Sequence, residues 1–120
     1  MLDRLTKHGI SACLATATAS VPAWADQKYP DILTADEYGR KRHHGNRHTF
    51  CPSSANFRRL STTLARRIAE RYADHPALML WHIGNEYGTY CWCEACAAAF
   101  REWLLERYGS LVELNRRWYT

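Results

Sequence analysis

Apolar residues form two short runs along the chain, and each run predicts a strand. Residues 78–83 are apolar apart from one histidine and end at Gly84, which is typical of a strand that is buried on both faces. Residues 10–17 have a similar character, with mostly small side chains. We therefore expect two buried strands of a parallel sheet.

Elsewhere, apolar residues recur at spacings of three and four, which predicts helices. The longest helix should cover residues 54–73 and stop before Pro76. Shorter helices are expected over residues 2–8 and 94–108, each followed by a glycine that ends it. Residues 110–113 form a capping box that opens a last helix, which meets no stop signal before the chain ends. The expected apolar faces consist of Phe57, Leu60, Leu64, Ile68 and Tyr72 on the longest helix, and of Phe100, Trp103 and Leu104 on the helix of residues 94–108.

The segment between the first strand and the longest helix is predicted to be a long loop. Val21-Pro22 and Tyr29-Pro30 disfavour helix in residues 19–30. A basic stretch, residues 40–48, follows. A loop of this length in a compact domain is usually functional or disordered.

The predicted order of elements points to a fold class. The order is helix, strand, long loop, helix, strand, loop, helix and helix. This alternation of helices and strands is typical of parallel βαβ units. Two strands cannot form a parallel sheet that covers its own edges. The sequence therefore predicts an α/β protein in which residues 1–120 are one piece of a larger α/β domain.

Composition and charge exclude few function classes. The 120 residues are 47% hydrophobic and carry a net charge of +4, which is ordinary for a globular protein and too mild to indicate a nucleic-acid partner. The basic stretch lacks the interleaved aromatic residues that would stack on bases. No apolar run approaches the roughly 20 residues of a membrane helix. Residues 23–25 have the form of a signal cleavage site, but the run before them is weak, so we expect a cytoplasmic protein without a signal peptide.

Asn85 and Glu86 directly follow the predicted strand of residues 78–83. In parallel α/β sheets and barrels, chemistry lies at the carboxyl ends of strands. A carboxylate there lies at the mouth of a low-dielectric core, where its pKa can be raised until it acts as a general acid. The alternative is an ordinary solvated carboxylate in a loop.

Five cysteines suggest a metal site. Cys91, Cys93 and Cys96 lie within six residues, and Cys51 precedes the longest helix. Four thiolates suit structural zinc, which takes four ligands in a tetrahedron, whereas an odd number of cysteines argues against a framework made only of disulfides. Free or disulfide-linked cysteines are the alternative. Cys13 lies in a predicted strand and is expected to be a small core residue.

Several segments together carry a resemblance to a known family. They are residues 14–19 and 22–24, residues 45–52 (Gly-Asn-Arg-His-Thr-Phe-Cys-Pro), residues 81–88 (Trp-His-Ile-Gly-Asn-Glu-Tyr-Gly) and the three clustered cysteines. Over nearly all of its length, the chain resembles the glycoside hydrolase family 42 β-galactosidases. The resemblance implies a (β/α)8 TIM barrel, with residues 10–17 as about the third strand and residues 78–83 as the fourth. Residues 1–120 would then be a partial catalytic barrel domain.

The resemblance also implies roles for individual residues. Glu86 would be the proton donor and general acid/base of a retaining β-galactosidase, Asn85 would bond the 2-hydroxyl of the sugar, and Arg47 would contact galactose. The substrate would be a β-galactoside, hydrolysed in carbohydrate catabolism, and the full-length form would be a homo-oligomer, a trimer in many members. The ligands of a structural zinc ion would be Cys51, Cys91, Cys93 and Cys96.

The chain departs from the family pattern in a few places. Gly84 stands where aspartate or another polar residue is expected, Ala17 replaces a usual proline, and Ser53 replaces a usual asparagine. A barrel of this type has about 250 residues, and the family nucleophile, a glutamate on the seventh strand, has no counterpart here. We therefore expect a fragment that is inactive by itself, because its remaining candidate carboxylates lie on predicted helices: Glu102, Glu106 and Glu113.

Two other functions remain open from the sequence. The first is a small zinc-binding interaction module built on Cys51 and the clustered cysteines, although such a module would not need the apolar strand of residues 78–83. The second is another retaining glycosidase of the same barrel clan, in which an Asn-Glu pair also follows the fourth strand. The segment of residues 45–52 and the cysteine cluster favour family 42.

Overall fold

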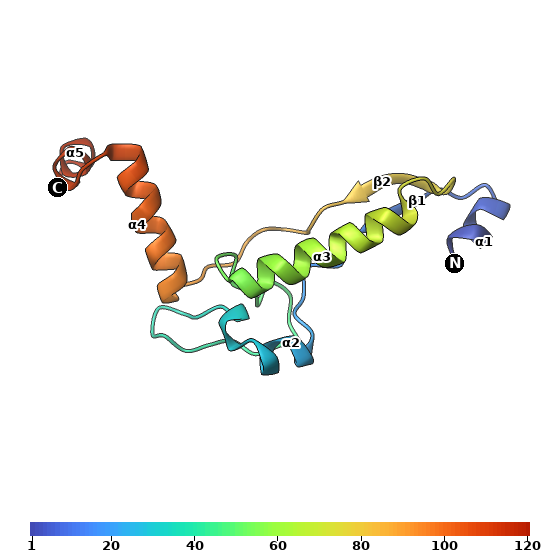
Figure 1. Ribbon diagram of the computed structural model, residues 1–120, viewed down its shortest axis with the longest axis horizontal. Coiled ribbons are helices and arrows are strands. Elements are labelled where there is room, and N and C mark those ends of the chain that lie inside the picture. The colour runs from blue at the N-terminus through green and yellow to red at the C-terminus, as the bar shows by residue number, and fades with distance from the viewer.

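Two parallel strands and one long helix form the centre of the structure, a computed structural model that describes residues 1–120 (Figure 1). The molecule is elongated, with principal extents of 63 × 32 × 20 Å. The N-terminal helix lies at one end and the two C-terminal helices at the other (Figure 1). In chain order the elements are α1 (Leu2–Lys7), β1 (Ala12–Ala15), α2 (Ala23–Lys28), the 3-10 helix η1 (Pro30–Ile32), α3 (Ala55–Tyr72), β2 (Leu78–His82), α4 (Glu94–Tyr108) and α5 (Leu111–Trp118).

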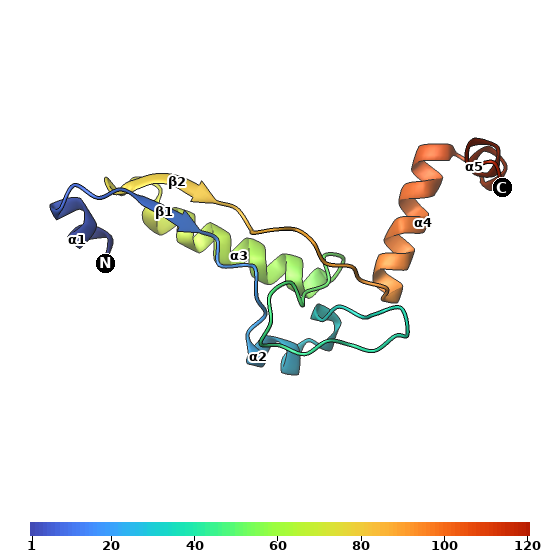
Figure 2. The same cartoon turned by 180° about the vertical axis from the view of Figure 1, so that it is seen from behind.

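The two strands pair in parallel, as predicted. Ala12 lies opposite Leu78 and Ala15 opposite His82, with one irregularity in register after Ala12. Helix α3 is the connection that returns the chain to the start of β2, and it runs alongside the two strands (Figure 2). This is one βαβ unit, and it places the carboxyl ends of both strands at the same edge of the sheet.

Capping residues set the helix ends close to the predicted positions. The Ser54 hydroxyl accepts a hydrogen bond from the Phe57 N–H at 3.1 Å, which starts α3 one residue after the predicted start. Helix α4 has the predicted bounds, and Gly109 follows it with φ of +71°. Ser110 caps α5 by accepting from the Glu113 N–H at 3.2 Å. Helix α5 ends at Trp118, before the chain does.

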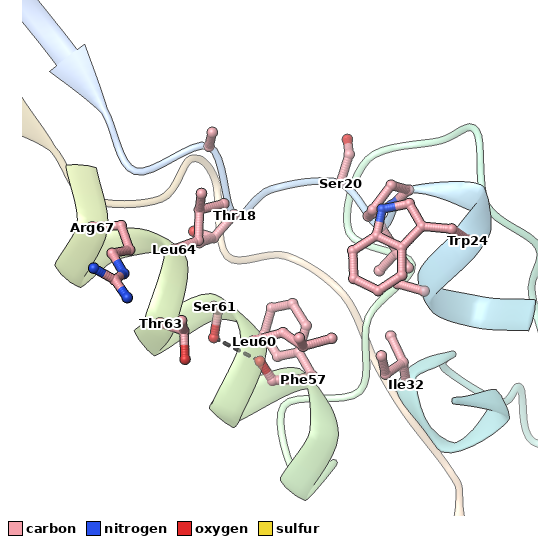
Figure 3. A pocket seen from close by; sticks show the side chains of 14 residues that line it. Thr18, Ser20, Trp24, Ile32, Phe57, Leu60, Ser61, Thr63, Leu64 and Arg67 are labelled. Carbon is pink, nitrogen blue, oxygen red and sulfur yellow. Dashed lines mark hydrogen bonds between the residues drawn. The ribbon is translucent and has the colours of Figure 1, made fainter. Parts of the chain in front are cut away.

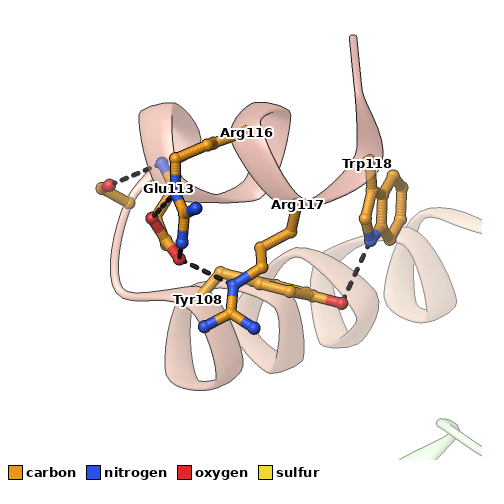
Figure 4. A network of polar contacts seen from close by, with 6 residues as sticks. Tyr108, Glu113, Arg116, Arg117 and Trp118 are labelled. Carbon is orange, nitrogen blue, oxygen red and sulfur yellow. Dashed lines mark hydrogen bonds and ion pairs between the residues drawn. The ribbon is translucent and has the colours of Figure 1, made fainter.

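The Glu113 side chain does not close the predicted capping box. Its carboxylate instead accepts hydrogen bonds from Arg116 and Arg117 in the next turn of α5 (Figure 4). The two guanidinium groups lower the pKa of Glu113 to about 2. Nearby, the indole N–H of Trp118 donates to the Tyr108 hydroxyl at 3.0 Å and ties α5 to the end of α4.

Helix α2 contradicts the prediction of a loop over residues 19–30. Pro22 occupies the N-cap position of this helix, where a missing N–H costs no hydrogen bond. The helix forms because its apolar side can be buried: Val21, Ala25 and Ile32 make up the small hydrophobic core of the structure. Phe57 of α3 packs on this core together with Phe50, and their rings stack at 4.1 Å.

The two strands are not buried on both faces, contrary to prediction. Met79 is 66% exposed and Ile83, just after β2, is 71% exposed. Cys13 is exposed rather than part of a core. Phe100 and Trp103 on α4, which were expected to point inward, are exposed as well. The apolar patterns are those of core elements, but residues 1–120 do not supply the layers that would cover them. No helix of the structure is both long and apolar enough to cross a membrane.

Candidate active site and metal centre

Glu86 lies four residues beyond the carboxyl end of β2, in a sharply turned loop. Gly84 and Glu86 both have positive φ, +74° and +45°. The Tyr87 hydroxyl donates to the Ile83 carbonyl at 2.8 Å and folds the phenol ring over Gly84. A Cβ atom at residue 84 would collide with that ring. The positive φ therefore favours glycine at this position, where the family pattern has a polar residue, and a side chain here would also require the Tyr87 ring to move.

The Arg47 guanidinium reaches Glu86 from the basic loop, residues 40–48. Its Nη2 donates to the Glu86 carboxylate at 2.9 Å, and both side chains are largely exposed, at 61% and 70%. Arg47 is placed there by backbone pairing, because it forms an antiparallel bridge with Ser20 in the segment that follows β1. Segments after β1 and β2 thus meet at one edge of the sheet, where chemistry is expected in parallel α/β folds.

Asn85 presents one satisfied and one unsatisfied polar group. Its main-chain carbonyl accepts a hydrogen bond from His48 Nε2 at 2.5 Å. Its side-chain Nδ2 is buried without any hydrogen-bond partner. A buried donor without a partner is costly unless a ligand or water completes it. Sequence reasoning assigned no role to His48, although it lies within the segment of residues 45–52 that carries the family resemblance.

The basic loop is held to α2 by hydrogen bonds between His44 and Asp26. His44 Nδ1 lies 2.7 Å from the carboxylate of Asp26, which is buried on α2, and the His44 N–H donates to the same oxygen at 3.3 Å. Within the same region, Arg40 Nε lies 2.7 Å from the carboxylate of Asp36. The loop that carries Arg47 is therefore ordered by local contacts.

The four predicted metal ligands come together. The sulfur atoms of Cys51, Cys91, Cys93 and Cys96 all lie within 4.8 Å of one another. Cys51 Sγ is 3.5 Å from Cys93 Sγ and 3.4 Å from Cys96 Sγ, and all of these cysteines are free thiols. Four sulfurs at about 2.3 Å from a central zinc ion would be separated by about 3.8 Å, so the cluster fits a tetrahedral ion after small shifts.

Backbone contacts position the cysteines, and their surroundings affect their protonation. The Cys51 N–H donates to the Ile32 carbonyl and the Trp92 N–H donates to the Ala35 carbonyl, so both cysteine segments are attached to residues 32–35. Burial raises the pKa of Cys51. Burial would also raise the pKa of Cys93, the N-cap of α4, but hydrogen bonds from the Cys96 N–H and the neighbouring thiols lower it to about 7. The lowered pKa favours the thiolate form of Cys93, which is the form that binds a metal ion.

A mainly apolar hollow of the structure lies away from these residues. It has a volume of about 560 Å³ and lies between α3 and residues 17–25, lined by apolar side chains that include Trp24, Phe57 and Leu64 (Figure 3). Neither Glu86 nor Arg47 contributes to it. We assign the candidate active site to the Glu86 loop because charged and unpaired polar groups converge there.

Comparisons with known proteins agree along the whole chain. The sequence model of the glycoside hydrolase family 42, which is described as β-galactosidase, matches residues 1–120. β-Galactosidase BgaA of Planococcus sp. strain SOS Orange is 53% identical over 119 residues, which are 99% of this chain and 18% of BgaA. A crystal structure of β-galactosidase from Bacillus circulans sp. alkalophilus has a TM-score of 0.93 at 52% identity, over 99% of this chain and 18% of that one. Gan42B, a GH42 β-galactosidase from G. stearothermophilus, has a TM-score of 0.94 at 42% identity, with the same coverage.

These likenesses also confirm the predicted fold class. The chain spans about 18% of the length of the relatives it matches. Its arrangement of α1 to α5 around β1 and β2 is that of the corresponding part of those β-galactosidases. The structure is therefore an α/β fragment of a (β/α)8 TIM barrel, at about strands 3 to 4.

Proposed function

Because the chain belongs to the glycoside hydrolase family 42 β-galactosidases, we propose that residues 1–120 are part of the catalytic barrel domain of a β-galactosidase. The enzyme removes terminal β-D-galactosyl residues from β-galactosides in carbohydrate catabolism. One observation in the structure carries the proposal: Glu86 follows a parallel strand at its carboxyl end and is paired with Arg47 at 2.9 Å. This is the place where a barrel enzyme keeps its reacting groups.

Glu86 acts as the general acid and base of a retaining mechanism. As an acid it protonates the glycosidic oxygen of the leaving group, and as a carboxylate it then activates the water that attacks the glycosyl-enzyme. The nucleophile is a second carboxylate about 5–5.5 Å away, supplied by a part of the barrel outside residues 1–120. Glu102 and Glu106 lie on α4, and Glu113 on α5 is held by two arginines.

Arg47 and Asn85 bind the sugar. The exposed Arg47 guanidinium exchanges its contact with Glu86 for hydroxyl groups of galactose when substrate binds, since guanidinium groups readily bond to oxygen acceptors. The buried, unpaired Nδ2 of Asn85 donates to a sugar hydroxyl next to the bond that is broken. Both contacts orient the substrate toward Glu86.

One zinc ion is held by Cys51, Cys91, Cys93 and Cys96. The support is a set of four thiols whose sulfurs lie within 4.8 Å of one another. Zinc with four thiolate ligands has no open position for substrate, so its contribution is to hold protein segments together. The cluster of free thiols suits the reducing cytoplasm. The full-length form is a homo-oligomer, with a trimer suggested by family resemblance.

Two alternative functions have less support. A free-standing zinc module would need only the cysteine segments, whereas the family match extends over residues 1–120. Another glycosidase of the same clan would share the Asn-Glu pair, but the model that matches this chain is that of family 42.

The decisive experiment replaces the acid/base. The experiment uses the full-length enzyme, in which residues 1–120 lie within a complete barrel. Its Glu86→Ala variant should lose about 10²- to 10⁴-fold in rate on substrates with poor leaving groups, and much less on activated aryl galactosides, because only poor leaving groups need a proton. Azide should partly restore turnover of the activated substrates by replacing the water that Glu86 activates.

A matched control is available on α4. Glu102→Ala removes an exposed carboxylate outside the candidate site and should leave the rates unchanged. Equal losses of Glu86→Ala on all substrates, without azide rescue, would assign Glu86 a binding role and overturn the proposal.

A further inference from the structure

His48 makes a contact that the proposed mechanism does not use. Its Nε2–H donates to the main-chain carbonyl of Asn85 at 2.5 Å, across a separation of 37 residues. That carbonyl belongs to the peptide group that joins Asn85 to Glu86. The imidazole therefore holds the segment of backbone from which the Glu86 side chain projects.

The His48 side chain is itself held in place by a chain of contacts. Its main-chain N–H donates to the Ala19 carbonyl at 2.9 Å, which fixes it to the segment after β1. Its ring meets Phe50 edge-on, with centroids 6.3 Å apart, and Phe50 stacks on Phe57 of α3 at 4.1 Å. The imidazole thus connects the Glu86 loop to α3, the longest helix of the structure.

The Glu86 loop needs such a restraint. Glu86 has φ of +45°, a left-handed conformation that is unfavourable for residues other than glycine and persists only when surrounding contacts enforce it. The Tyr87 hydroxyl fixes the Ile83 carbonyl before the turn. No main-chain N–H donates to the Asn85 carbonyl, so the hydrogen bond from His48 is what fixes the peptide next to Glu86.

We infer that His48 is a positioning residue for Glu86: it fixes the Asn85–Glu86 peptide and thereby aims the Glu86 carboxyl at the glycosidic oxygen. The inference rests on the proposed acid/base function of Glu86. His48 does not touch the reacting atoms in this arrangement, because its Nε2 is occupied by the Asn85 carbonyl. Its effect is on the placement of the carboxyl, and small misplacements of a reacting group cost up to about 10²-fold in rate.

The test compares two replacements of His48 in the full-length enzyme across aryl galactosides of different leaving-group acidity. His48→Leu removes the donor and should lower kcat by about tenfold or more on poor leaving groups, with a change of less than about threefold on activated ones. His48→Gln keeps an N–H donor at the end of a flexible side chain and should recover a large part of the loss. If the leucine variant does not fold, His48→Ala takes its place.

Controls separate this inference from the proposed function. His43→Ala removes an exposed histidine of the same loop that makes no hydrogen bond, and it should leave the leaving-group dependence unchanged. Glu86→Ala is measured in parallel, and a lack of leaving-group dependence there would overturn the proposed function itself. If Glu86→Ala shows the dependence while His48→Leu loses rate equally on all substrates, or His48→Gln is no better than His48→Leu, the positioning role of His48 is overturned alone.

Discussion

At the scale of single residues, the clearest electrostatic feature is the pair of Asp26 and His44. The His44 ring holds the pKa of Asp26 below its ordinary value, against the opposing effect of burial. The folded pKa is lower than the unfolded one, so the pair stabilises the fold above about pH 3.9. That contribution is lost as the pH falls through the folded pKa. The pair joins α2 to the basic loop, and so supports Arg47 and His48 indirectly.

We predict that removal of the His44 ring raises the pKa of Asp26. Carbon NMR of the labelled carboxyl in the full-length enzyme should give a titration midpoint below about 3.9 for the wild-type protein, and a higher midpoint for His44→Ala. Asp36, whose partner is Arg40, serves as the internal control and should not shift. An unchanged Asp26 midpoint in the variant would show that His44 is not the cause.

The proximity of the expected site residues could be predicted because a motif carries them. Arg47, Asn85 and Glu86 were expected in one site, and the structure places them together. His48 lies in the segment of residues 45–52 that carries the resemblance, but its contact could not be predicted, because it is a hydrogen bond to a main-chain carbonyl 37 residues away. The prediction that Cys13 is a core residue was wrong, because Cys13 is exposed. The layers that would cover its strand are not supplied by residues 1–120.

At the scale of elements, the cysteine cluster connects the basic loop to the start of α4. Cys51 precedes α3, while Cys93 caps α4 and Cys96 lies in its first turn. Helix α4 leads away from α3 (Figure 1), so few other contacts fix its direction. Within this cluster, Cys91 lies five residues beyond Glu86, and Cys51 lies three residues beyond His48. A bound ion would therefore hold together the two segments that form the candidate active site.

We predict about one zinc ion per chain in the full-length enzyme, as expected for one closed four-thiolate site. Cys93→Ser should lose the metal, because it removes one of the four thiolate ligands. Cys13→Ser, which changes a cysteine far from the cluster in sequence, should keep it. Elemental analysis after gel filtration measures both. Absence of zinc from the wild-type protein, or a disulfide between Cys91 and Cys96, would contradict the assignment.

The sequence predicted helices well where local chemistry sets their ends. Ser54, Ser110 and Gly109 carry capping preferences that act within a few residues, and the observed ends agree. Helix α2 was missed because two prolines were taken to exclude helix, whereas Pro22 lies just before the first turn and Pro30 follows the last. Its formation depends on burial of Ala25 against Ile32, which a local pattern does not reveal.

At the scale of the whole molecule, apolar surface is exposed along both strands and α4. A two-stranded parallel sheet has two open edges, and the apolar residues of β2 have no covering layer on residues 1–120. This is the expected condition of one βαβ unit of a barrel whose neighbouring units cover such faces. A zinc ion in the cysteine cluster would order the Glu86 edge, but it would not supply strands.

We predict that residues 1–120, expressed alone, have no β-galactosidase activity and self-associate. Retaining hydrolysis needs a second carboxylate about 5–5.5 Å from the first, whereas Glu102 and Glu106 lie on α4 and Glu113 on α5 is held by two arginines. The exposed apolar faces also favour aggregation. A chromogenic β-galactoside assay together with light scattering checks both points, with the full-length enzyme as the active control. Turnover by a soluble, monodisperse sample of residues 1–120 would mean that a nucleophile is present within them.

The contact between Gly84 and Tyr87 has a consequence for the volume available at this turn. The phenol ring occupies the space that a side chain at residue 84 would fill. The Tyr87 ring is 76% exposed, so it can swing outward into solvent when a larger residue takes that space. Glycine at position 84 thus lets the ring lie over the turn, two residues before Glu86.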